Sequence, residues 1–153
     1  MIIETFQIIF DRDLQKLQSE LEMYRDEQAI WHIEQSIANS AGNLCLHLIG
    51  NLNAFIGVGL AKTSYVRNRD LEFSLKDIPR ASLLQQLEAT RKVVEVGLSS
   101  ISDKDLEGEF PILVWKEKAS MEYTLIHLVT HLNYHLGQVN YHRRLLDHQI
   151  DRS

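Results

Sequence analysis

Residues 120–146, SMEYTLIHLVTHLNYHLGQVNYHRRLL, are the stretch of sequence that decides the fold. Apolar residues recur in it at steps of three and four, which is the period of an amphipathic α-helix. Ser120 is a candidate N-cap, because its hydroxyl can accept a hydrogen bond from a backbone N–H of the first turn. The pattern predicts a helix from Ser120 to about Leu146. Its apolar face consists of Leu125, Leu128, Val129, Leu132, Leu136 and Val139.

Three earlier segments show the same period and are also predicted to be helices. The first covers residues 2–27, the second runs from Ser40 to about Ala61, and the third runs from Pro79 to about Ser99. Proline suits the first turn of a helix, where its missing N–H costs nothing. Acidic residues exceed basic residues in the first segment, which predicts a solvated outer face for that helix.

The connections between these helices are unusually long. Residues 62–78 and 102–119 are polar-rich stretches, predicted to be loops, whereas antiparallel neighbours in a bundle need only about 2–8 residues. A helix of about 22 residues is about 33 Å long, and about 17 extended residues can span about 56 Å. The sequence therefore predicts an all-α, four-helix bundle in which at least one connection crosses the length of the bundle.

Length and composition fit one soluble domain over residues 1–153. Sixteen Lys and Arg against 21 Asp and Glu give a formal charge of -5, which argues against binding to nucleic acid. The N-terminus has no basic region typical of a signal peptide, and no stretch approaches about 18 uncharged apolar residues. We therefore expect a cytoplasmic protein that does not bind a membrane.

Seven histidines against a single cysteine are the unusual feature of the composition. Three of them, His127, His131 and His135, recur at steps of four in the last predicted helix. Residues four apart lie on one helical face, so two such imidazoles can chelate one ion. Because successive steps of four drift by about 40° each, we expect His131 and His135 to be ligands and His127 to pack nearby or support them.

His47 is the natural third ligand, because it stands among aliphatic residues in the second predicted helix and a buried histidine needs a polar partner. Three histidines with an open position are typical of catalytic zinc sites. Against this, most histidine pairs spaced by four are simply exposed or hydrogen-bonded. The other histidines, His32, His142 and His148, follow no pattern and are expected at the surface.

Several other chemistries are excluded by the residues present. A zincin requires H-E-x-x-H, but leucine follows both His127 and His131. Di-iron bundles use paired Glu-x-x-His motifs, and no such pair occurs in the last three predicted helices. Cys45 has no nucleophile context and is expected to be a buried structural cysteine.

Two sequence blocks resemble a known group of proteins. The first runs from Asn39 to Leu52 (NSAGNLCLHLIGNL) and contains His47; the second is His131-x-x-x-His135-x-Gly137-Gln138. Together they resemble the DinB/YfiT-like superfamily of metalloenzymes, and in particular a bacterial branch of it without an assigned activity. The resemblance covers nearly the whole chain.

The resemblance implies a four-helix bundle of up-down-down-up topology that forms homodimers. It also implies a divalent metal ion, zinc or nickel, held by His47, His131 and His135. Characterised members include thiol-dependent S-transferases and a thiol-dependent isomerase. It therefore implies a small-molecule substrate and a low-molecular-weight thiol as a second cofactor.

Two further residues could orient the ligands or a substrate. Gln138 lies one turn beyond His135, and Asn51 lies one turn beyond His47; equally, both could simply face solvent or cap a loop. Three functions follow from these residues: a metal-dependent thiol S-transferase, a metal-dependent hydrolase, and a non-enzymatic bundle that binds a metal or small molecule in a stress response. The hydrolase ranks lower because no carboxylate base is evident on the histidine face.

Overall fold

All regular elements in the described part of the chain are helical, which confirms the all-α prediction. The computed structural model describes residues 1–150, with side chains for residues 1–147, so the expectation for His148 lies outside the described side chains. The α-helices are α1 (Ile2–Met23), α2 (Ala41–Leu52), α3 (Arg69–Ser74), α4 (Arg80–Ser99) and α5 (Met121–Ile150). Shorter elements are the 3₁₀ helices η1 (Glu27–Trp31) and η3 (Asp103–Asp105) and the π-helical turn η2 (Asn53–Val58).

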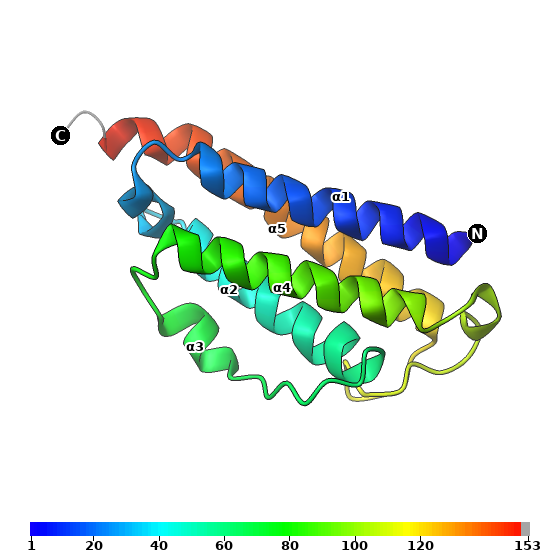
Figure 1. Ribbon diagram of the computed structural model, residues 1–153. Coiled ribbons are helices and arrows are strands. Elements are labelled where there is room, and N and C mark those ends of the chain that lie inside the picture. The colour runs from blue at the N-terminus through cyan, green and yellow to red at the C-terminus, as the bar shows by residue number, and fades with distance from the viewer. Residues whose placement is uncertain (151–153) are drawn as a thin grey trace.

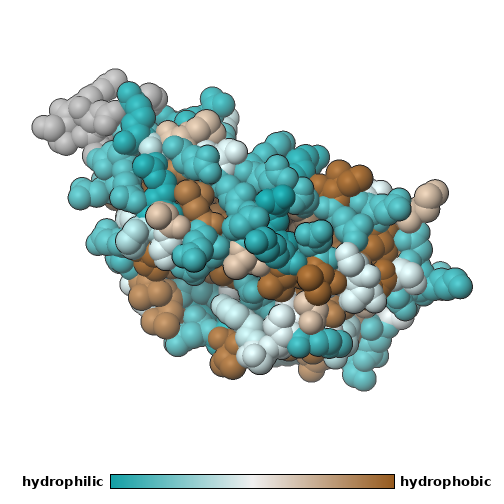
Figure 2. Space-filling view, viewed as in Figure 1, coloured by the Kyte–Doolittle hydropathy of each residue, from teal (hydrophilic) through white to brown (hydrophobic). Residues whose placement is uncertain are grey.

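The four long helices pack side by side around one core. α1 contacts α4 and α5, and α2 contacts the same two helices. Figure 1 shows α1 and α5 running in one direction and α2 and α4 in the other. Because α2 and α4 run the same way, the connection between them returns along the length of the molecule, and α3 lies in this connection. Hydrophilic side chains cover most of the face in Figure 2, interrupted by small hydrophobic patches.

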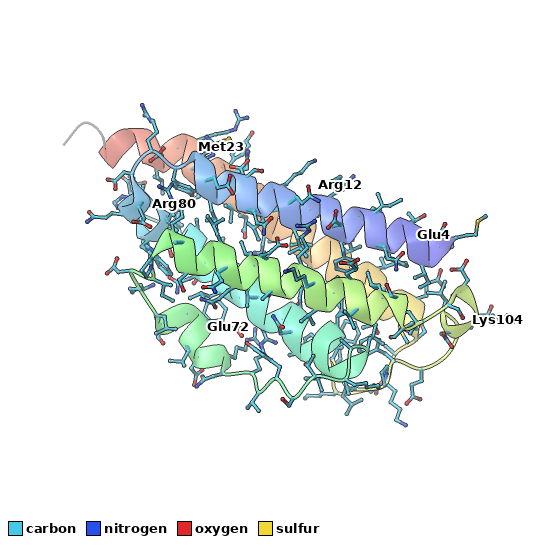
Figure 3. The ribbon with its side chains drawn as sticks, viewed as in Figure 1. Glu4, Arg12, Met23, Glu72, Arg80 and Lys104 are labelled. Carbon is cyan, nitrogen blue, oxygen red and sulfur yellow. The ribbon has the colours of Figure 1, made fainter. Side chains whose placement is uncertain are left out.

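The helix boundaries agree with the sequence at some ends and differ at others. Ser40 caps α2 by accepting a hydrogen bond from the backbone N–H of Asn43 at 3.1 Å, as predicted. α1 ends at Met23 rather than near residue 27, because the extended backbone of Tyr24 leads into η1. The side chain of Arg80, the first residue of α4, binds carbonyl groups at the C-terminal end of α1. Its Nη1 donates to the backbone oxygens of Leu21 and Tyr24 at 3.2 and 2.6 Å (Figure 3).

We expected residues 62–78 to be a loop, but they contain the short helix α3. Asn68 caps this helix, because its Oδ1 accepts a hydrogen bond from the backbone N–H of Leu71 at 3.3 Å. Acidic residues in the first turn, Asp70 and Glu72, favour a helix at this point because they complement the positive end of the helix dipole. α3 packs on α2, which holds this part of the connection against the outer side of that helix (Figure 1).

The expectation that the acidic residues of the first helix face solvent is wrong for two of them. Asp13 is fully buried and Glu20 nearly so, both where α1 packs on α5. The side-chain amide of Asn133 donates to Asp13 at 3.0 Å, and that of Asn140 donates to Glu20 at 2.6 Å. Because buried carboxylates are costly without partners, these pairs, seven residues apart on both helices, set the register of α1 against α5.

One helical stretch, Ala41–Val58, is long and apolar enough to cross a membrane by length and composition alone. The sequence led us to expect none. Most of this stretch, 78%, is buried inside the protein, and a core helix of a soluble protein has the same character. The stretch is therefore only weak evidence for a membrane span.

His142 is buried, so its expected surface location is wrong. Its Nδ1 lies 2.6 Å from the hydroxyl of Tyr24, and its Nε2 lies 2.8 Å from the backbone oxygen of His32. A carbonyl oxygen can only accept, so Nε2 carries the proton and Nδ1 accepts from Tyr24. Burial lowers the pKa of His142 below its ordinary value of 6.5.

Because His142 is buried, we predict that it lowers the free energy of unfolding in mild acid. Below pH 6.5 the unfolded chain binds a proton at His142 that the folded chain excludes, so stability falls as the pH falls through this range. Urea unfolding at pH 7.5 and 5.5 should show a smaller loss in His142→Gln than in the wild type, because glutamine does not titrate. His47 and His131 titrate in both proteins and cancel in the comparison. Equal losses in the two proteins would contradict the prediction.

Candidate metal centre

Three histidines from two helices meet at one point. His47 extends from α2, and His131 and His135 extend from one face of α5, which packs on α2. The Nε2 atom of His131 lies 3.2 Å from Nε2 of His47 and 3.2 Å from Nε2 of His135. His47 is 7% exposed, and the other two are half-buried. The structure thus brings together the three residues that the sequence singled out, and this group could bind a metal ion.

The spacing of these nitrogens fits a tetrahedral ion. Imidazole nitrogens bind zinc at about 2.0–2.1 Å, so two of them at tetrahedral angles lie about 3.3 Å apart. The observed separations of 3.2 Å match this value. The three ligand atoms of the group all lie within 4.8 Å of one another, and the group could hold a metal ion.

In His47 and His135, the hydrogen-bond partner of Nδ1 determines whether Nε2, the nitrogen that faces the other histidines, carries a proton. Nδ1 of His47 lies 3.0 Å from a carboxylate oxygen of Glu72, and Nδ1 of His135 lies 2.7 Å from Oε1 of Gln138. Both partners are acceptors, and Glu72 is closer to Nδ1 of His47 than the donor Nη2 of Arg67, which lies 3.4 Å away. Each Nδ1 therefore carries the proton, and each Nε2 presents a lone pair. A cation could bind both of these lone pairs, whereas a proton on Nε2 of His131 can be donated to only one of them at a time.

Burial keeps two of the rings, those of His47 and His131, neutral at neutral pH. Burial lowers the pKa of His131 to about 4, assisted by the neighbouring His135, His47 and His127. Burial also lowers the pKa of His47, against the opposing effect of Glu72. Neutral imidazole is the form that binds metal ions, so these two rings are ready for ligation at neutral pH.

The other candidate residues differ in whether they contact the cluster. His127 stacks beside His131 with ring centroids 6.0 Å apart and contacts Trp115 edge-to-face at 4.8 Å, so it packs nearby. Gln138 contacts His135, as described above. Asn51 is buried, and its Oδ1 has no hydrogen-bond partner among the described residues. Cys45 is buried too, and burial raises the pKa of its thiol, which leaves it protonated and unreactive.

Sequence reasoning missed Glu72 and Arg67, which reach the cluster from the long connection. The carboxylate of Glu72 contacts His47, and Arg67 pairs with this carboxylate at 2.8 Å. Figure 3 shows Glu72 between α3 and α2. The only local signal was the helix-start pattern at Asn68, with acidic residues in the following turn. It predicts the short helix but not its contact with His47, 25 positions away in sequence.

The chain was compared with known protein families and with curated proteins. A family model described as "Protein of unknown function (DUF1572)" matches residues 3–151, nearly the whole chain. No match is found among the curated proteins.

Proposed function

The chain belongs to the DUF1572 family, and from this premise we propose that it is a metal-dependent enzyme of the DinB/YfiT-like superfamily. The proposed fold is the up-down-down-up four-helix bundle of that superfamily. Its support is the shared direction of α2 and α4, opposite to that of α1 and α5, with the long connection between them. The proposed ligands are His47, His131 and His135, and the single observation that carries the proposal is the convergence of their Nε2 atoms.

The resemblance to the superfamily implies zinc or nickel, and imidazole nitrogen suits both ions. When bound, such an ion supplies an open position at which the pKa of a thiol is lowered and the nucleophilic thiolate is favoured. We propose that the reaction is a thiol S-transfer to a small electrophile. Aromatic side chains beside the cluster, Trp115 against His127 and Tyr134 against His135, offer apolar surfaces that such an electrophile could contact.

A hydrolase would need a free base near a bound water molecule. Glu72 is the carboxylate that the structure places in contact with the cluster, but it touches the Nδ1 edge of His47, opposite to the converging Nε2 atoms. Its other contact is the guanidinium of Arg67. This placement supports transferase chemistry over hydrolysis.

Turnover assays test the proposed reaction. Protein loaded with Zn²⁺ or Ni²⁺ should conjugate a low-molecular-weight thiol to a generic electrophile such as a chlorodinitrobenzene. The rate should fall to background after metal removal and in His47→Ala, and it should be unchanged in His32→Ala, which alters a histidine outside the cluster. Hydrolysis of ester substrates without thiol, or no metal-dependent turnover with several thiols, would contradict the proposal.

We also propose a cytoplasmic homodimer that acts on a small molecule. The exposed side chains of Tyr134, Tyr141 and Leu145 share one face of α5, at steps of seven and four. Such a face offers apolar surface to a second copy of the chain, and light scattering in solution measures the mass directly.

A further inference from the structure

We propose that Glu72 is a positioning residue for His47. We also propose that α3, in the long connection between α2 and α4, holds Glu72 in contact with His47. This inference rests on the proposed metal site. Glu72 would hold the proton on Nδ1 of His47, so that Nε2 always presents its lone pair toward His131 and His135. Nothing in the local sequence around His47 supplies this partner.

The carboxylate of Glu72 is held by two partners that use both of its oxygens. It is 6% exposed, and Oε1 lies 3.0 Å from Nδ1 of His47. Arg67 donates to both oxygens, from Nε to Oε2 at 2.8 Å and from Nη2 to Oε1 at 3.0 Å. A guanidinium that binds both carboxylate oxygens through charge-assisted hydrogen bonds fixes the orientation of the carboxylate. An ionised carboxylate at Nδ1 also makes the imidazole a better metal ligand.

Helix α2 makes room for this carboxylate at Gly50. Gly50 is three residues beyond His47, so both lie on the same face of α2. A Cβ atom at position 50 would overlap Oε2 of Glu72 and would lie 2.6 Å from its Cδ. Glycine is therefore the residue that lets the carboxylate lie flat against the helix and reach the ring of His47.

The backbone that carries Glu72 is anchored to α2 by Asn43. The side-chain amide of Asn43 donates to the backbone oxygens of Glu72 and Leu75, each at 2.9 Å. Its Oδ1 accepts from the hydroxyl of Ser40 at 2.7 Å. Phe73, next to Glu72, packs its ring against the ring of His47 with centroids 5.1 Å apart. Two side chains of α3, the carboxylate of Glu72 and the ring of Phe73, thus contact the single ligand that α2 supplies.

Metal affinity of two variants tests this role. Glu72→Gln removes the charge while keeping the size, and Gly50→Ala leaves Glu72 in the sequence but displaces its carboxylate. We expect each to weaken Zn²⁺ binding about 10- to 100-fold, the usual effect of losing a partner behind a ligating histidine, as measured by competition with a chelating dye. Glu95→Gln, at an exposed position of α4, and Gly137→Ala, where a Cβ would meet nothing within 4 Å, are matched controls and should bind like the wild type.

A second readout separates positioning from a general effect on folding. In the metal-free protein, ¹⁵N NMR of the imidazoles should show His47 protonated at Nδ1 in the wild type and a mixture of tautomers in Glu72→Gln and Gly50→Ala. Unchanged tautomer and unchanged Zn²⁺ affinity in both variants would overturn the inference while leaving the metal site intact. A wild type that binds no Zn²⁺ would overturn the proposed function, and the tautomer of His47 would still decide the role of Glu72.

Discussion

His131→Ala is expected to abolish metal binding by the protein. Nε2 of His131 makes both of the 3.2 Å approaches within the cluster, so its removal leaves His47 and His135 without the nitrogen between them. Loss of a residue that supports a ligand can lower metal affinity by up to about 100-fold, and loss of the ligand itself should lower it further. Zn²⁺ titration followed by calorimetry should change from one ion per chain in the wild type to no detectable binding.

His127→Ala is the matched control for this experiment. It removes a histidine from the same helix, one turn away, whose ring stacks beside His131 without joining the group of converging nitrogens. Zn²⁺ should bind to this variant with wild-type stoichiometry. Binding of one ion by His131→Ala, or loss of binding in His127→Ala alone, would show that the ligand set is wrong.

Asn43→Ala is expected to destabilise the fold by about 3 kcal/mol, because it leaves buried carbonyl groups without donors at about 1–3 kcal/mol each. Asn43 is fully buried and links the start of α2 to two backbone oxygens at the end of α3. The loss should appear as a lower midpoint in urea unfolding at pH 7.5. The same variant should bind Zn²⁺ more weakly, since the backbone of Glu72 is released.

Asn39→Ala provides the comparison for this prediction. Asn39 lies in the segment before α2 and is partly exposed, so its truncation should change stability by no more than about 0.5 kcal/mol. If Asn43→Ala unfolded at the same urea concentration as Asn39→Ala, the anchoring of α3 by Asn43 would be incorrect.

The histidine cluster could be predicted from the sequence because the patterns that indicate it lie within short segments of the chain. The spacing of His131 and His135 places them on one helical face, and the aliphatic surroundings of His47 place it inside. Only the pairing of α2 with α5 was needed to bring the two parts together, and the resemblance to a known superfamily implied the same three residues. The all-helical architecture was equally accessible, since its signal is a period within each segment.

The remainder of the site depends on contacts between residues far apart in the chain. Glu72 looks like one charge among several in a polar connection, and only the packing of α3 against α2 reveals its contact with His47. In the sequence, Asp13 and Glu20 look like acidic residues exposed to solvent. The sequence of α1 gives no sign of the α5 asparagines that donate hydrogen bonds to them. His142 is similar: its partners, Tyr24 and the backbone of His32, are more than 100 positions away.

X-ray diffraction from crystals soaked in Zn²⁺, recorded at the zinc absorption edge, tests the central claim most directly. We predict one strong anomalous peak per chain, about 2.0–2.1 Å from the Nε2 atoms of His47, His131 and His135. A peak bound through the Nδ1 atoms, a peak at another site, or no peak within the cluster at saturating Zn²⁺ would contradict the account.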